Sequence, residues 1–295
     1  MNIAVSGANG SIAKGLLPYL EKRGFNVIKI SNSLERNGSN QFSFNDLIQN
    51  NIKVQVDIFI HLASFNSKLD AENFENEISL TKNVLDAIQS LNCNKIIFFS
   101  SCKVYGEPKM NSSVVYSEVN NTQPNCFYSK AKLICENLIQ LEFKKSGLNS
   151  IILRLPPVIN NSKKSNLTRL LKMSRLFPFL SFSEGESNKR SFLSNLNLTD
   201  ALIHIIDNLN IFHGTNIYNL CDSDYISINN FLKIYGQKKI FLLPKFFSNI
   251  LLSMPILAKI FIRLYGDQMI ANIKFQNEMN FILRTTEQCL SIIKK

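Results

Sequence analysis

The residues best suited to chemistry in this chain are Tyr128 and Lys132, which lie four positions apart at the start of an apolar run. Residues at this spacing share one face of a helix, so both side chains can point into a single site. An ammonium beside a phenol favours the phenolate and lowers the pKa of the tyrosine from its free value of about 10. Such a tyrosine can exchange a proton with an alcohol near neutral pH. Because chance could also produce this pair, its meaning depends on the surrounding elements.

A strand, a glycine turn and a helix open the chain. The strand at residues 2–5 leads into Gly7 and Gly10, and a helical pattern then continues to Lys22. Gly7 permits a tight turn, and Gly10 lets a pyrophosphate approach the backbone at a helix N-terminus. Ala13 occupies the third position of the fingerprint, where a small residue still allows a helix to pack closely on a strand. The pattern therefore favours dinucleotide binding over a plain turn.

Residues 25–31 form the second predicted strand, whose end indicates the type of dinucleotide. In NAD-binding proteins an acidic residue at this point bonds the adenine ribose. Here the strand ends in Ser31 and Asn32, and Arg36 follows closely. The strand end carries no carboxylate, which would repel the 2′-phosphate of NADP, so NADP(H) is favoured. Glu35 keeps NAD(H) as the alternative.

Strands and helices continue to alternate along the chain. Such alternation predicts an α/β fold, a doubly wound parallel Rossmann-type sheet with its ligand at the carboxyl ends of the strands. The remaining predicted elements are strands at 56–64, 95–101 and 150–155, a helix at 71–92, and a helix that follows a loop to Pro124, carries Tyr128 and Lys132 and runs to about Lys145.

Five motifs occur in a fixed order along the chain: Gly7-x-x-Gly10, the strand end His61–Leu62–Ala63, the segment Ser100–Gly106, Tyr128-x-x-x-Lys132, and Leu153–Val158. Each motif is weak by itself, but together they resemble the extended short-chain dehydrogenase/reductase superfamily, in its NAD(P)-dependent nucleotide-sugar epimerase/dehydratase branch. The resemblance covers nearly the whole chain. It implies a nucleotide-sugar substrate and a smaller, mostly helical C-terminal substrate-binding region.

The resemblance also implies a role for each site residue. Tyr128 would be the general acid/base at a sugar hydroxyl or its ketone, and Ser101 would hydrogen-bond the same oxygen. Lys132 would bind the nicotinamide ribose and hold the pKa of Tyr128 down. Arg190 would bind the substrate diphosphate, because a planar guanidinium matches phosphate oxygens. No metal site is expected. The expected cofactor-binding residues are Gly7, Asn9, Gly10, Ser11, Ile12, Ser31, Asn32, Leu62, Ala63, Ser64, Tyr128, Lys132 and Pro156.

The reaction within this branch is less sharply defined. The acidic pair of the 4,6-dehydratases is missing, since Cys102 and Lys103 stand beside Ser101. The acidic residue that usually follows the second strand of the 4-epimerases is missing too. We therefore favour hydride transfer at C4 by a 4-ketoreductase acting on a UDP-4-keto-6-deoxy sugar or a similar substrate. A UDP-hexose or N-acetylhexosamine 4-epimerase is the alternative, and a non-catalytic NADP-binding regulatory or scaffold protein is the alternative of another class.

Composition and charge limit the partners. The net charge is +11, and much of the excess lies between residues 160 and 190. No nucleic-acid signature accompanies it, so nucleic acid is disfavoured. Six scattered cysteines and the absence of a leader indicate a cytoplasmic protein with reduced thiols. In the resembling family the helices corresponding to 71–92 and 124–145 pair with their symmetry mates, which implies a homodimer.

We expect a dinucleotide-binding domain at 1–160 and a substrate-binding region at 161–295, with 192–221 returning to the first domain. The segment 240–266 is apolar and contains scattered Lys, Arg and Pro residues. It contains no charge-free run long enough to span a bilayer. A helical substrate lid is the favoured interpretation, and weak contact with a membrane surface is the alternative.

Overall fold

The computed structural model describes residues 1–31, 40–65, 71–159, 181–234 and 241–293. Within them the chain forms two compact units, each made of three segments. The first, called the sheet unit, comprises Met1–Val104, Thr122–Leu155 and Thr199–Tyr218; the second unit comprises Tyr105–Asn121, Pro156–Leu198 and Asn219–Lys295. The predicted boundary at residue 160 falls outside the described residues. The predicted returning segment 192–221 is divided, and only 199–218 belongs to the sheet unit.

A seven-stranded sheet with the order β11-β7-β5-β4-β1-β2-β3 forms the centre of the sheet unit. In this sheet the six neighbouring strands β7, β5, β4, β1, β2 and β3 all pair in parallel. The chain moves outward from β1 to β2 and β3, and then crosses to β4 on the other side of β1. This reversal between β1 and β4 is where doubly wound sheets bind ligands. The predicted fold class is confirmed. The strands are β1 (Asn2–Ser6), β2 (Asn26–Ile30), β3 (Gln41–Phe42), β4 (Ile58–His61), β5 (Lys95–Ser101), β7 (Asn149–Leu155) and β11 (Thr215–Asn219).

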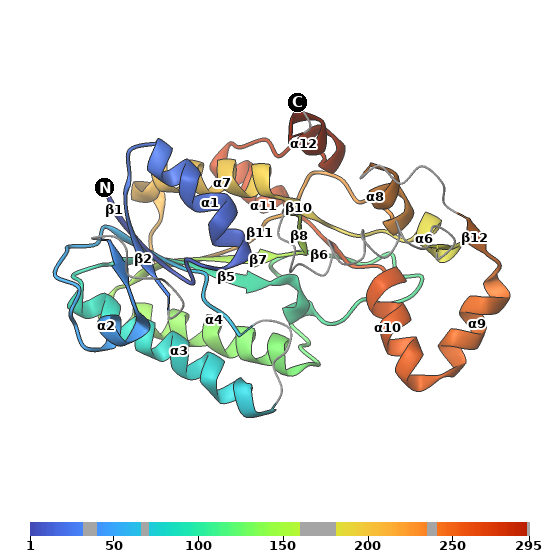
Figure 1. Ribbon diagram of the computed structural model, residues 1–295, viewed down its shortest axis with the longest axis horizontal. Helices are drawn as coiled ribbons and strands as arrows, with labels where there is room; N and C mark the ends of the chain where they lie inside the picture. Colours follow the sequence, from blue (N-terminus) through green and yellow to red (C-terminus); the bar gives the residue numbers. More distant parts are fainter. Residues whose placement is uncertain (32–39, 66–70, 160–180, 235–240, 294–295) are drawn as a thin grey trace. The chain divides into compact units, whose positions relative to one another are not determined.

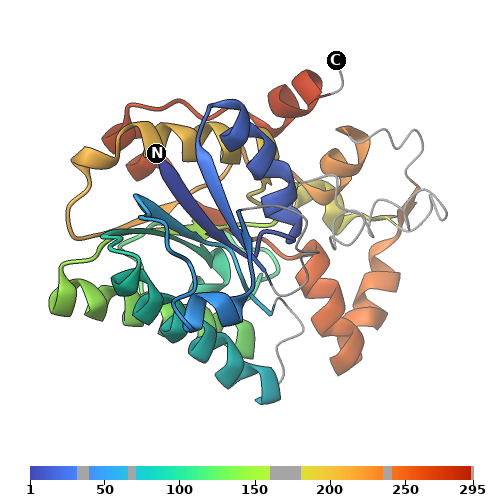
Figure 2. The same ribbon diagram turned by 60° about the vertical axis from the view of Figure 1, so that its left-hand side comes forward.

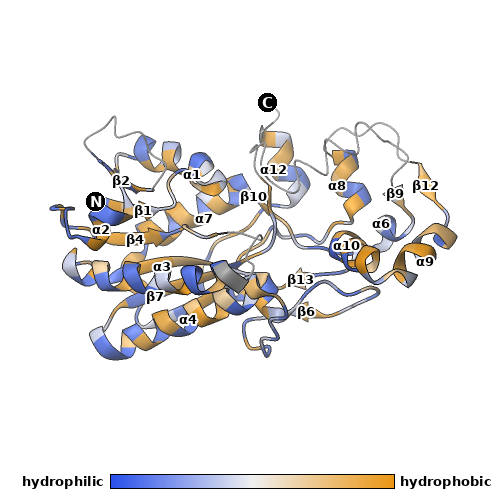
Figure 3. Ribbon diagram, turned by 60° about the horizontal axis from the view of Figure 1, so that its bottom comes forward, coloured by the Kyte–Doolittle hydropathy of each residue, from blue (hydrophilic) through white to orange (hydrophobic). Residues whose placement is uncertain are grey.

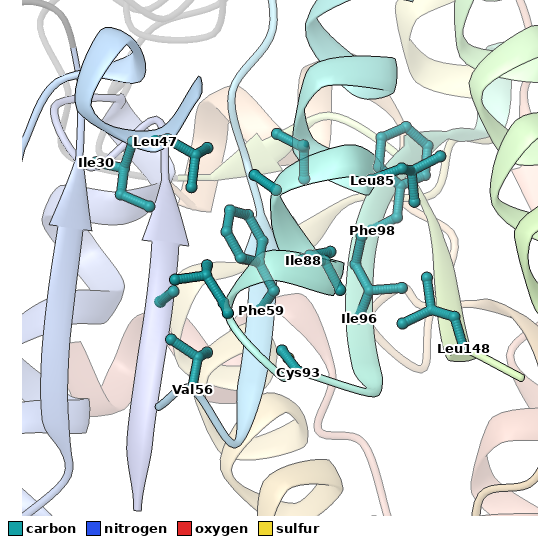
Figure 4. Packing of buried hydrophobic residues seen from close by; sticks show 14 of the residues in the cluster. Ile30, Leu47, Val56, Phe59, Leu85, Ile88, Cys93, Ile96, Phe98 and Leu148 are labelled. Carbon is teal, nitrogen blue, oxygen red and sulfur yellow. The ribbon is translucent and has the colours of Figure 1, made fainter. Parts of the chain in front are cut away.

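Helices cover both faces of this sheet. Helices α1 and α7 lie on one face, and α2, α3 and α4 lie on the other (Figures 1 and 2). The buried core beneath α3 and α4 consists mainly of isoleucine, valine, leucine and phenylalanine side chains, including Phe59, Ile88 and Phe98 (Figure 4). The helices and short turns are α1 (Ser11–Lys22), α2 (Phe44–Ile48), α3 (Ala71–Ser90), η2 (Cys102–Tyr105), α4 (Phe127–Ser146), α7 (Asn195–Asp207) and η3 (Leu209–Ile211).

The second unit contains short strand pairs and small helices around its own apolar cluster, which includes Phe182, Phe192, Phe231 and Phe261. Its elements are β6 (Val115–Tyr116), β8 (Val158–Ile159), β9 (Ser181–Phe182), α6 (Glu184–Ser187), β10 (Leu193–Ser194), α8 (Ile228–Ile234), β12 (Leu242–Leu243), α9 (Lys245–Ser253), α10 (Pro255–Tyr265), β13 (Met269–Ile270), α11 (Ile273–Met279) and α12 (Thr286–Ile293).

Helices α9 and α10 occupy the apolar segment predicted to be helical. Prolines mark both starts, Pro244 as the N-cap of α9 and Pro255 at the first position of α10, where a missing N–H costs nothing. Apolar residues make up much of both helices (Figure 3). Several of their side chains are exposed, including Phe246 and Ile256 at 68% and 77%. Among the described residues, no helix is both long and apolar enough to cross a bilayer. The lid and membrane-surface interpretations of this segment stay predictions.

Candidate active site

The glycine turn after β1 is closed by backbone contacts. Gly7 has a φ of +74°, a left-handed conformation that favours glycine. Its N–H donates to the carbonyl of Ile30 at the end of β2, at 2.8 Å. A Cβ on Gly7 would lie 2.7 Å from both the N and the Cα of Ala63, which follows β4. The loops that follow β1 and β4 therefore meet backbone to backbone at the reversal point of the sheet.

The N-terminus of α1 follows directly after this contact and has no side-chain cap. Gly10 is the N-cap residue, and its own N–H donates to the carbonyl of Gly7 at 2.8 Å. The first turn of the helix contains no acidic residue. A pyrophosphate suits such a turn, because the N–H groups at a helix start attract negative charge. Ser11 and Ile12, the first two residues of the helix, would present these amides.

The other predicted cofactor residues are placed as follows. Leu62 and Ser64 are half-buried in the loop after β4, beside the buried Ala63, and Asn9 lies within the glycine turn. Ser31 is buried directly after β2, where its N–H donates to the carbonyl of Phe42. Asn32 lies outside the described residues, and Pro156 is the first residue of the middle segment of the second unit.

Helix α4 carries the predicted tyrosine–lysine pair in its first two turns. The helix starts at Phe127, and just before it the N–H of Cys126 donates to Ser129 Oγ at 3.2 Å. Tyr128 is half-buried, whereas Lys132 is only 3% exposed. The Nζ atom of Lys132 lies 5.9 Å from the centroid of the Tyr128 ring, which confirms that the two side chains share one face.

Ser101 ends strand β5 and completes the trio. Its side chain hydrogen-bonds the Tyr128 phenol, and its Oγ also accepts a bond from the N–H of Lys103 at 3.3 Å. Twenty-seven residues separate Ser101 from Tyr128 in the sequence (128 − 101), yet the end of β5 and the start of α4 bring them together. The structure therefore unites Ser101, Tyr128 and Lys132 in the sheet unit.

The predicted lowering of the pKa of Tyr128 is wrong for this structure, because the pKa is raised above 10. Burial is the largest cause, since it penalises the phenolate. Lys132 lowers the pKa as predicted, and so does the hydrogen bond from Ser101, but burial and the charge of Glu77 outweigh them. Tyr128 is therefore a neutral phenol at neutral pH.

Glu77 on α3 is the site residue that the sequence reasoning missed. Its Oε1 lies 3.0 Å from Lys132 Nζ, and only 1% of the residue is exposed. The signal was a carboxylate one turn before Thr81 and on the same helix face as Val84, both of which are buried. A prediction of the buried helix face from apolar residues alone does not identify a buried carboxylate.

His61, which belongs to one of the five motifs, and Arg190, the predicted diphosphate ligand, both have partners within the protein. His61 is fully buried, and its ring nitrogens bond Ser6 Oγ at 2.7 Å and Thr81 Oγ1 at 3.2 Å. Burial and the nearby Lys132 charge lower the pKa of His61 to about 3, so it stays neutral. Arg190 is buried in the second unit, and its Nη1 donates to backbone carbonyls of residues 263, 264 and 266. Its predicted contact with a substrate diphosphate stays a prediction.

Two hollows lie among the described residues, and neither is lined by Ser101, Tyr128 or Lys132. The larger, of about 490 Å³, is lined by Met1, Asp57 and Lys95 at the amino ends of β1, β4 and β5, the sheet edge opposite the trio. The smaller, of about 350 Å³, lies in the second unit and is lined mainly by polar side chains, among them Ser112 and Asn188. We therefore place no catalytic function in the larger hollow.

Comparison with known proteins agrees with this geometry. The family model described as the NAD dependent epimerase/dehydratase family matches residues 3–221. The chain belongs to this family. The family membership predicted from the motifs is thereby confirmed.

The chain matches two curated relatives over only part of their length. A UDP-glucose 4-epimerase from Vibrio cholerae is 29% identical over 136 residues, which cover 46% of this chain and 40% of that protein. The UDP-glucose 4-epimerase 3 of Oryza sativa subsp. japonica is 33% identical over 82 residues, covering 28% of this chain and 21% of that protein. The chain thus matches less than half the length of these relatives.

Solved structures resemble the chain over nearly its full length. UDP-N-acetylglucosamine 4-epimerase from Bacillus cereus has a TM-score of 0.72 at 18% identity, and the match covers 100% of both chains. UDP-glucose 4-epimerase from Thermotoga maritima, solved with UDP-glucose, has a TM-score of 0.75 at 17% identity, covering 99% of this chain and 97% of that one. UDP-glucuronic acid 4-epimerase from Bacillus cereus, solved with NAD, has a TM-score of 0.75 at 18% identity over 98% and 93%. At these identities the likeness shows the fold.

Proposed function

We propose that this chain transfers hydride at C4 of a nucleotide sugar with a pyridine nucleotide as its cofactor. The observation that carries the proposal is the gathering of Ser101 and Lys132 around Tyr128, at the carboxyl edge of a sheet whose glycine turn suits a pyrophosphate. When bound, the pyridine nucleotide supplies a hydride donor or acceptor for the sugar carbon.

In the reducing direction, Tyr128 acts as a general acid. The phenol is neutral, so it can donate its proton to the C4 oxygen while a hydride reaches the C4 carbon. Ser101 hydrogen-bonds the same oxygen and stabilises the negative charge that develops there. Lys132 stabilises the phenolate that remains. The oxidising direction is the reverse step: Tyr128 must first lose its proton, and its phenolate then takes the proton of the C4 hydroxyl as hydride leaves the carbon. The two directions together make up the two half-reactions of an epimerisation.

Net 4-epimerisation is the form that the comparisons favour, since the relatives and structural neighbours described above are 4-epimerases. Net 4-ketoreduction is the second candidate. It is favoured by Ser31 at the end of β2, where no carboxylate stands to select NAD. The cofactor preference follows the same division, with NAD for an epimerase and NADP(H) for a reductase.

The deciding experiment follows the purified protein with UDP-glucose, UDP-N-acetylglucosamine, UDP-glucuronic acid and a UDP-4-keto-6-deoxy sugar, each with NAD and with NADPH. Proton NMR of the sugar reports epimerisation, and loss of the absorbance of reduced nicotinamide reports reduction. A 4-epimerase converts one of the first three sugars without net consumption of cofactor. A protein that is folded, binds dinucleotide and turns over none of these substrates would contradict the proposal in favour of a non-catalytic role.

A further inference from the structure

Glu77 carries a carboxylate that is almost completely buried, where an ionised group is energetically unfavourable. It lies on the face of α3 that also buries Thr81 and Val84, with 1% of the residue exposed. Removing an ionised carboxylate from water costs several kcal/mol unless partners compensate, so such a group persists only where it is paired. The partners of Glu77 therefore indicate what it does.

Those partners come from two other parts of the sheet unit. Oε1 lies 3.0 Å from Nζ of Lys132 on α4, and Oε2 accepts a 2.8 Å hydrogen bond from the N–H of Phe65. The side chain of Ser64 also hydrogen-bonds the carboxylate. Burial alone would raise the pKa of Glu77, but Lys132 and these hydrogen bonds lower it overall. One carboxylate thus joins the lysine to the loop after β4.

The charges around Tyr128 can now be compared. Lys132, from the same helix, lowers the pKa of the phenol, whereas Glu77 from α3 and Cys102 from η2 raise it. His61 from β4 is neutral, because its pKa is lowered to about 3, and the pKa of Cys135 on α4 is raised by burial, so its thiol is neutral. Glu77 therefore supplies the negative charge that opposes the ammonium next to the phenol.

We propose that Glu77 is a positioning residue for the trio: it fixes Lys132 Nζ against the loop at 62–65 and opposes the effect of the ammonium on Tyr128. Its relevance to turnover rests on the proposed function, but the electrostatic part does not. Lys132 Nζ lies over the rings of Phe98 and Tyr128, 4.8 and 5.9 Å from their centroids, and forms an ion pair with Glu77. Removing the carboxylate leaves the ammonium with the phenol as its nearest acidic partner, so the phenolate becomes more stable.

Glu77→Gln tests the inference, because it keeps the size and hydrogen-bonding atoms of the side chain and removes its charge. Tyrosine ionisation is followed by ultraviolet difference absorbance in the protein without added cofactor or substrate. Subtracting the same titration of a Tyr128→Phe variant isolates Tyr128. We expect the midpoint of Tyr128 to move to lower pH in Glu77→Gln. Glu77→Asp, which restores the charge, should return the midpoint toward the wild-type value.

The matched control is Glu136→Gln, which breaks a second buried ion pair of α4, between Glu136 and Arg154 at 2.7 Å. It removes an equally buried carboxylate whose described hydrogen-bond partners, Ser100 and Arg154, lie outside the trio, so the Tyr128 midpoint should stay in place. An unchanged midpoint in Glu77→Gln, or an equal shift in Glu136→Gln, would overturn the inference. If Glu77→Gln does not fold, Glu77→Asp decides instead: its shorter side chain draws the carboxylate back from Lys132 Nζ, so the Tyr128 midpoint should lie below the wild-type value, and an unchanged midpoint would overturn the inference.

The titration separates this inference from the proposed function. If the protein converts no nucleotide sugar but the titration midpoints are as expected, the proposed reaction is wrong and the role of Glu77 still holds. If the enzyme is active but the Tyr128 midpoint is the same in Glu77→Gln and in the wild type, the proposed reaction holds and the role of Glu77 is wrong. In an active enzyme, the pH dependence of turnover should move with the titration midpoint in Glu77→Gln.

Discussion

Replacing Gly7 with alanine tests the architecture of the dinucleotide turn directly. The φ of +74° costs a residue with a β-carbon about 1–2 kcal/mol. In addition, the new Cβ would lie 2.7 Å from two backbone atoms of Ala63, and backbone cannot swing aside as a flexible side chain can. Shifting such packed atoms adds about 1–3 kcal/mol. The free energy of unfolding should therefore fall by about 2–5 kcal/mol in Gly7→Ala.

Gly24→Ala is the matched control, because Gly24 has a similar φ of +81° and no atom lies within 4 Å of the position that a β-carbon would take there. It should lose only the conformational cost of about 1–2 kcal/mol. Urea unfolding followed by circular dichroism measures both losses, and calorimetric titration with NAD and NADPH measures binding. Dinucleotide binding should weaken in Gly7→Ala and persist in Gly24→Ala. Equal destabilisation of the two variants, or unaltered binding by Gly7→Ala, would refute the close contact of the two loops.

Four further predictions follow from the described geometry. Tyr128→Phe should lower turnover by about 10²–10⁴-fold in a steady-state assay while dinucleotide binding survives, since only the phenolic oxygen is removed; Lys132→Met should lower it at least as much, and Ser101→Ala less, because water can replace one hydrogen bond. Near-normal turnover by Tyr128→Phe would exclude the proposed mechanism. Burial raises the pKa of Asp222 from 3.8 to about 6, so the folded state holds this proton more tightly than the unfolded state. Its contribution to stability is therefore fully present below pH 3.8 and is lost as the pH rises through about 6; urea unfolding at several pH values measures it, and a loss in the opposite direction would contradict the assignment. NADPH should bind more tightly than NADH if the end of β2 selects a reductase cofactor, whereas NAD retained through purification would favour the epimerase. Light scattering at micromolar concentration should give the mass of a homodimer, and a strictly monomeric mass would count against pairing through α3 and α4.

The long elements of the sheet unit could be predicted from the sequence because their patterns are local. The strand at Lys95–Ser101 agrees with its prediction at both ends, and the helix that begins near Tyr128 ends within a residue of its predicted end. Continuous apolar runs and a sustained helical period are strong signals for buried strands and long helices. The two-residue strand β3 and the five-residue helix α2 carry no comparable signal.

The charge balance of the site could not be predicted, because it depends on groups that only the fold brings together. The Tyr128–Lys132 spacing indicated the right pair, but the direction of the net pKa shift depends on burial and on Glu77, fifty-one residues before Tyr128 (128 − 77). Arg190 shows the same limit: its sequence context indicated an anion-binding arginine, while the fold surrounds its Nη1 with backbone carbonyls.

The division of each unit into three segments has a consequence for how the protein is made. Strand β11, at one edge of the central sheet, ends at Asn219, so the sheet cannot be completed until that residue has left the ribosome. Ser101, Tyr128 and Lys132 all emerge well before that point. Until then the three residues belong to an incomplete sheet with an exposed edge at β7, and a chain ended at residue 160 would keep that edge. Such an unpaired edge invites pairing with other chains.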